Sequence, residues 1–211
     1  MRTQFVARPY ALFAYIAAFS LFLPGTAHAD SLPNLSTSSL TVLVSVDGHA
    51  DHAALREMKQ ELSSIMQEAG RKVEVRLRTE AARDETFDDV VLVKLKGNCK
   101  VDRLIPYMDE RGPLAFTHVT DGVILPFAQV ECDRLSRSIG QALYGEERKQ
   151  PGKYLGRAIG RVVAHELYHI LGKTHEHNHD GSLAKEAISA KRLIADKRLS
   201  FDVQDMSRML P

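Results

Sequence analysis

Residues 165–175 read HELYHILGKTH and place three histidines, one glutamate and one glycine within eleven positions. On a helix, His165 and His169 lie about one turn apart on the same face, so both imidazoles can bind one metal ion. Glu166 follows the first histidine and can accept a proton from a metal-bound water. The segment therefore predicts a long helix that carries a zinc site, around which the rest of the chain must fold.

The second half of the segment predicts a turn and a third ligand. Gly172 can adopt the left-handed conformation that ends helices without steric cost, which would let the chain turn back toward the metal. His175 would then be the third ligand. Three histidines leave one coordination position for water and substrate, as in catalytic rather than structural zinc sites.

This spacing, H-E-x-x-H-x-x-G-x-x-H, resembles the signature of the metzincin zinc endopeptidases. The resemblance implies one α+β catalytic domain: a twisted mixed sheet with a backing helix, a long active-site helix and a short C-terminal subdomain. It also implies one catalytic Zn²⁺ on His165, His169 and His175, with Glu166 as general base. In that family an edge strand binds the substrate as an additional strand, and residues 114–119 are the candidate here.

Two features depart from the family pattern or leave it open. The histidines continue in His177 and His179, either of which could replace His175 on the metal, although the spacing favours His175. Metzincins also place a methionine turn beneath the zinc, whereas by counting Leu183 occupies that place. The later methionines are Met206 and Met209, so the turn could lie further on and the subfamily stays unassigned.

Apolar periodicity predicts the order of elements along the rest of the chain. Asp121-Gly122 predicts a hairpin turn, and an amphipathic helix is expected over residues 183–197. The predicted strands are 40–46, 72–78, 89–95, 114–119 and 123–130, and the other predicted helices are 51–69, about 134–143 and 154–171.

The N-terminus predicts export. Arg2 and Arg8 precede an apolar run over residues 10–23 and an Ala27-His28-Ala29 cleavage pattern, which together are typical of a signal peptide over residues 1–29. A flexible leader over residues 30–39 and a single catalytic domain over residues 40–211 would follow. We therefore expect a secreted or periplasmic protein without a stable membrane anchor.

The cysteines and charges narrow the chemistry further. Cys99 and Cys132 are the only cysteines, and in an oxidising compartment they are expected to form a disulfide; the alternative is two buried thiols. The chain has 28 basic and 27 acidic residues, so nothing in its charge predicts a nucleic-acid partner. The expected partner is a protein or peptide substrate, and the oligomeric state stays open.

These observations predict a secreted zinc-dependent metalloendopeptidase that hydrolyses peptide bonds with a water activated by Glu166. Two alternatives stay open. One is a non-catalytic, metzincin-like zinc-binding protein of the cell envelope, and the other is a zinc amidase that acts on cell-wall peptides.

Overall fold

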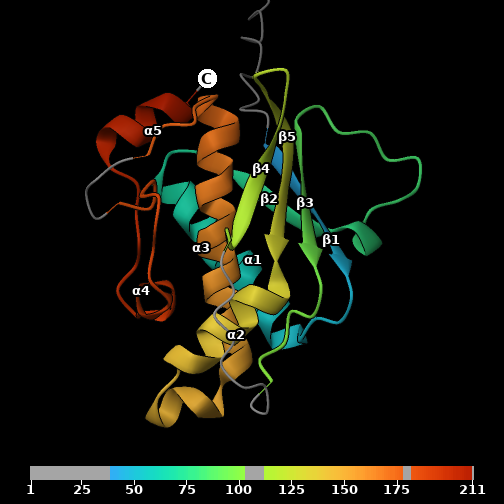
Figure 1. Cartoon of the computed structure of the whole chain (residues 1–211). Coiled ribbons are helices and arrows are strands. Elements are labelled where there is room, and N and C mark those ends of the chain that lie inside the picture. Colours follow the sequence, from blue (N-terminus) through green and yellow to red (C-terminus); the bar gives the residue numbers. More distant parts are fainter. Residues whose placement is uncertain (1–38, 103–111, 178–181, 211) are drawn as a thin grey trace, which may run out of the picture. The chain divides into compact units, whose positions relative to one another are not determined.

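A five-stranded mixed sheet in the order β2-β1-β3-β5-β4 forms one layer of the fold (Figure 1). The computed structural model describes residues 39–102, 112–177 and 182–210, all within the compact unit Ser36–Pro211. The predicted signal peptide and residues 30–38 of the predicted leader lie outside the described residues. The strands are β1 (Leu40–Asp47), β2 (Val73–Leu77), β3 (Val90–Lys96), β4 (Ala115–Thr120) and β5 (Val123–Glu131).

The sheet is parallel except at one edge. β1 pairs in parallel with β2 and β3, and β3 pairs in parallel with β5. β4 is antiparallel to β5 because the two strands form a hairpin, and Asp121 and Gly122 both adopt the positive φ that its tight turn requires. The predicted α+β class with a mixed sheet is therefore confirmed, as is the hairpin.

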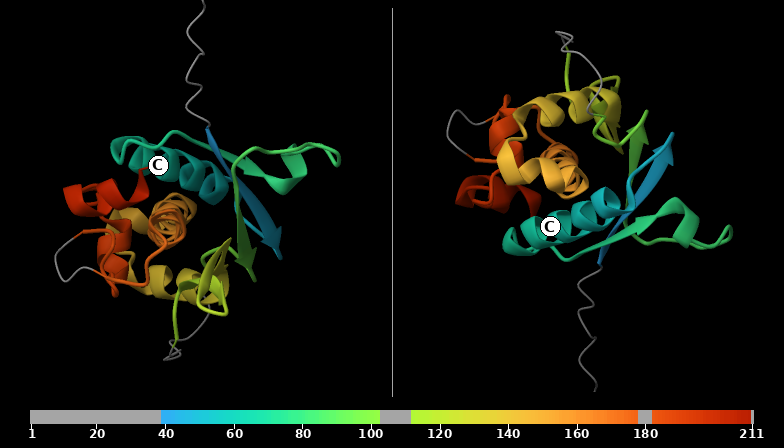
Figure 2. Two further views of the ribbon diagram at one scale, coloured as in Figure 1. Left: turned by 90° about the horizontal axis from the view of Figure 1, so that it is seen from above. Right: turned by 90° about the horizontal axis from the view of Figure 1, so that it is seen from below.

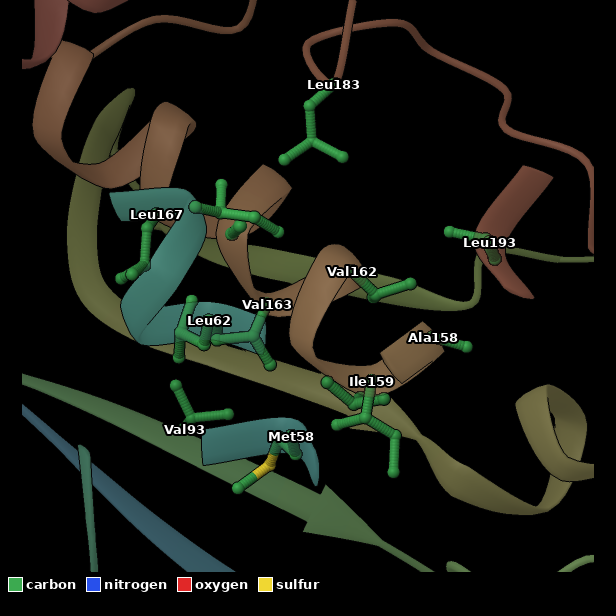
Figure 3. Close-up of a cluster of buried hydrophobic side chains, with 14 of the residues drawn as sticks. Met58, Leu62, Val93, Ala158, Ile159, Val162, Val163, Leu167, Leu183 and Leu193 are labelled. Carbon is green, nitrogen blue, oxygen red and sulfur yellow. The ribbon is translucent and has the colours of Figure 1, made fainter. Parts of the chain in front are cut away.

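Helices cover one face of this sheet (Figure 2). They are α1 (His52–Glu68), α2 (Cys132–Ala142), α3 (Pro151–Gly172), α4 (Ala190–Ile194) and α5 (Val203–Met209), with short 3-10 turns η1 (Arg78–Glu80) and η2 (Gly145–Lys149). Inward-facing strand residues such as Val93 meet Met58 and Leu62 of α1 and Ile159 and Val163 of α3 in the buried core (Figure 3). In the described residues, no helix has the length and apolar composition needed to cross a membrane.

The C-terminal part differs from the prediction of one helix over residues 183–197. Only α4 is helical there, and it begins after Ser189, whose hydroxyl accepts a hydrogen bond from the Arg192 amide. The Leu183 amide instead donates to the Ser200 carbonyl at 3.0 Å. Residues 183–189 form turns and irregular backbone instead of helix.

Two arginines of α3 hold this C-terminal segment. Arg161 is only 1% exposed, forms an ion pair of 2.7 Å with Glu61 of α1, and donates to the Arg192 carbonyl at 2.8 Å. Arg157 donates to the Ile194 carbonyl at 2.9 Å. These bonds satisfy carbonyls at the C-terminus of α4 that have no partner within the helix.

The predicted disulfide is confirmed. Cys99 and Cys132 are bonded, with Cα atoms 4.8 Å apart, and both residues are buried. The bond ties the segment after β3 to the first turn of α2. A cross-link across this loop is expected to stabilise the fold mainly by restricting the unfolded chain.

A row of glycines lets α3 approach α1 closely. Gly152, Gly156 and Gly160 recur every fourth residue and therefore lie on one side of α3. A Cβ atom at Gly156 would lie 2.3 Å from the Ala54 carbonyl oxygen, and one at Gly160 would lie 3.0 Å from the Met58 carbonyl oxygen. Glycines at every fourth position of the sequence could have predicted that α3 packs closely against another helix.

We therefore expect Gly156→Ala to destabilise the protein although alanine favours helices. The clash with backbone should cost about 1–3 kcal/mol net, more than the gain of roughly 1 kcal/mol in helix propensity. Urea unfolding measures the change. Gly172→Ala is the control, because its Cβ would meet nothing closer than 3.4 Å. Equal stabilisation of both variants would contradict the close contact.

Candidate metal centre

His165 and His169 turn the same ring nitrogen toward each other from successive turns of α3. Their Nε2 atoms are 3.0 Å apart. The Nδ1 of His165 lies 2.7 Å from the Leu183 carbonyl oxygen, and the Nδ1 of His169 lies 2.8 Å from the Thr174 carbonyl oxygen. Because a carbonyl only accepts, each Nδ1 carries a proton and donates, and this leaves the Nε2 lone pairs facing a common point.

The electrostatics of this pair favour a bound cation. Burial lowers the pKa of His165 to about 4 and also lowers the pKa of His169, so both rings are neutral near pH 7. Two nitrogen lone pairs then oppose each other at close range. Tetrahedral zinc with bonds of about 2.0–2.1 Å separates its ligand atoms by roughly 3.3 Å, which is close to the observed distance.

His177, not His175, completes the cluster. The ligand atoms of His165, His169 and His177 all lie within 4.8 Å of one another. The His177 ring stacks on His165 with centroids 5.3 Å apart and meets His169 edge-on at 4.8 Å. His175 is exposed and does not belong to this group, and His179 lies outside the described residues. The arrangement thus departs from the predicted ligand set of His165, His169 and His175.

The chain leaves α3 through a left-handed turn before it reaches His177. Gly172 is still helical, and Lys173 adopts the left-handed conformation with φ 46° and ψ 43°. The helix therefore ends at Gly172 as predicted, but the left-handed conformation expected at Gly172 is adopted by Lys173. The Thr174 amide then donates to the His169 carbonyl, which keeps Thr174 against the helix end. After this turn, the imidazole that lies beside His165 and His169 is that of His177.

The C-terminal helix holds the segment that carries His177. Arg208 of α5 forms an ion pair of 2.7 Å with Glu176 and a hydrogen bond of 3.4 Å to the Tyr168 hydroxyl. The periodicity analysis did not predict α5. The sequence feature that could have predicted α5 is Asp202, a residue type that favours the start of helices. Its side chain accepts a hydrogen bond from the Asp205 amide at the first turn of α5. The contact of Arg208 with Glu176 has no signal in the spacing of the sequence.

Leu183 lies at the position where the family pattern would have a methionine. Its side chain is fully buried, and its carbonyl accepts the hydrogen bond from His165. Met206 packs at the margin of the core and Met209 is buried, and both belong to α5. An apolar side chain other than methionine therefore lies beside the first histidine.

Glu166 is a buried acid at the edge of a cleft. It is 5% exposed, and burial raises the pKa of its carboxyl group to about 7. The Thr117 hydroxyl of β4 donates to its Oε2 at 2.7 Å, and this bond opposes the rise. A carboxyl group with a pKa near neutrality can take up and release protons at physiological pH.

A cavity of about 270 Å³ lies beside His165 and Glu166. It separates the start of β4 from the segment that leads to α4, and most of its wall is apolar. The lining residues are Gly112, Pro113, Leu114, Ala115, Val162, His165, Glu166, Lys185, Glu186, Ala187, Ile188 and Leu193. The cavity thus offers a place for an uncharged side chain next to the candidate metal and acid.

The ligand assignment predicts different effects for two neighbouring histidines. His177→Ala should weaken zinc binding by more than about 100-fold, because loss of a ligand exceeds the 10–100-fold typical of its supporting bonds. His175→Ala should leave the zinc affinity nearly unchanged. Competition with a chromogenic chelator measures both values. The reverse order would restore His175 as the third ligand.

Burial of Glu166 also predicts the pH dependence of stability without metal. Its folded-state pKa of about 7 exceeds the ordinary 4.5, so its contribution is complete below pH 4.5 and is lost as the pH rises through 7. Glu166→Gln should therefore gain stability over wild type across this window, on the order of 3 kcal/mol. Urea unfolding of both metal-free proteins from pH 4.5 to 8 tests this. A constant difference would contradict burial as the cause.

Comparison with known proteins supports the fold. No family model and no curated protein sequence matches the chain. Among solved structures, the chain is similar to archaemetzincin from Methanopyrus kandleri, with a TM-score of 0.50 and 13% sequence identity. The match covers 84% of this chain and 97% of that one. At this identity the likeness shows the fold alone: the chain has an α+β fold similar to that of this structure.

Proposed function

We propose that this chain is a zinc-dependent metalloendopeptidase that binds zinc through His165, His169 and His177 and uses Glu166 as general base. The observation that carries this proposal is the convergence of two unprotonated Nε2 atoms at 3.0 Å beside a third histidine. The buried carboxyl group of Glu166 follows His165 directly in the chain and lines the same cavity as His165. A site that only stores metal has no need of that acid.

In the proposed reaction, the residues around the metal site have separate roles. Bound zinc supplies Lewis acidity to a carbonyl and to a water molecule. The carbonyls of Leu183 and Thr174 hold the two helical imidazoles in the tautomer that can bind a metal. The Glu166 carboxylate takes the proton of the attacking water and passes it to the leaving amine, for which a pKa near 7 is suited.

We also propose that the protein acts outside the cytoplasm. The basic residues, apolar run and small-residue pattern over residues 1–29 support export. The Cys99–Cys132 disulfide fits an oxidising compartment. A protein or peptide of the envelope or the surroundings is then the expected substrate.

Replacement of Glu166 tests the proposed activity directly. Glu166→Gln should keep stoichiometric zinc but lose cleavage of an unfolded protein such as reduced casein, by at least about 100-fold, because the base is removed while the ligands stay. Zinc content and peptide release are measured on wild type and variant together. Zinc in both without cleavage in either would favour a non-catalytic zinc protein, or an amidase detectable with cell-wall peptides.

A further inference from the structure

Among the residues that the structure describes, Thr117 is the one whose side chain hydrogen-bonds to the carboxyl group of Glu166. Its Oγ1 lies 2.7 Å from Oε2 and 3.4 Å from the main-chain oxygen of the same residue. Within the described residues, Oε1 receives no hydrogen bond, so one oxygen is held and the other is left for a water molecule. A hydrogen bond to a carboxylate restricts its rotation as well as stabilising its charge.

The position of Thr117 in β4 directs its side chain toward α3. Its neighbours Phe116 and His118 have ring centroids 5.0 Å apart, and the His118 ring meets that of Phe127 of β5 in a tilted arrangement at 4.3 Å. Successive residues of a strand point to opposite faces, so this aromatic cluster directs Thr117 toward α3. The register of β4 with β5 shifts between Thr117 and Val119, and such bulges re-aim side chains.

We propose that Thr117 is a positioning residue for the general base. Its hydroxyl pins Oε2 of Glu166 so that Oε1 meets the water that attacks the substrate. The role rests on the proposed peptidase function. The same hydrogen bond connects the edge strand β4 to the helix that carries the base.

Variants at one position separate the hydroxyl from the methyl group. Thr117→Val keeps the shape and loses the donor. Thr117→Ser keeps the donor, whereas Thr117→Ala loses it, and both lack the same methyl group. Thr120→Val is the matched control, because Thr120 lies exposed on the same strand. The full-length mature protein is loaded with zinc, and kcat and KM are measured on a fluorogenic peptide found to be cleaved by wild type.

A positioning role predicts a selective loss of kcat. Thr117→Val and Thr117→Ala should lose roughly tenfold in kcat, with KM and zinc content unchanged, as expected for a lost hydrogen bond to a charged group. Thr117→Ser and Thr120→Val should resemble wild type. Equal kcat in the Ser and Ala variants would overturn the proposal, even if the Val variant failed to fold.

A spectroscopic readout tests the same contact without catalysis. In metal-free protein at pH 5, the infrared carbonyl band of neutral Glu166 is identified by its absence from Glu166→Gln. Loss of the donor in Thr117→Val should move this band to higher frequency, and an unmoved band would overturn the contact. If wild type binds zinc but cleaves no more than Glu166→Gln, the proposed function fails, and the positioning role fails with it.

Discussion

The close packing of α3 on α1 is the contact on which the other features of the structure depend. Three glycines on one side of α3 remove the side chains that would keep the helices apart. The other sides of α3 carry the side chains that contact the C-terminal segment, the core and the candidate metal site. Arg157 and Arg161 hold the C-terminal segment, Val163 and Ile159 fill the core, and the last turns carry His165, Glu166 and His169. These side chains therefore project from a helix that is itself fixed by close packing.

The candidate metal centre is assembled from segments that are distant in the sequence. The carbonyls of Leu183 and Thr174 orient the imidazoles of His165 and His169. Arg208 of α5 forms an ion pair with Glu176, the residue before His177. Burial that depresses the pKa of His165 and raises that of Glu166 opposes their charged forms and costs stability in metal-free protein. The same burial leaves two neutral imidazoles and a carboxyl group that titrates near neutral pH, as the proposed activity would require.

The antiparallel edge strand β4 borders the candidate active site on the side of the sheet. Ala115, its first residue, lines the cavity together with residues 112–114 before it, and Thr117 donates a hydrogen bond to Glu166. This links the position of the strand to the orientation of Glu166. The similarity to archaemetzincin accounts for the arrangement of sheet and helices, whereas the chemistry is argued from the side chains of this chain.

The sequence by itself determined what depends on local geometry. The spacing of four residues places His165 and His169 on one helical face, Asp121-Gly122 makes the hairpin turn, and apolar periodicity defines the strands and long helices. Tertiary structure decided the rest. Lys173 rather than Gly172 turns the chain, His177 rather than His175 reaches the cluster, and Thr117 meets Glu166 from 49 residues away. The last two outcomes depend on how segments pack in three dimensions, which the spacing of residues in the sequence does not encode.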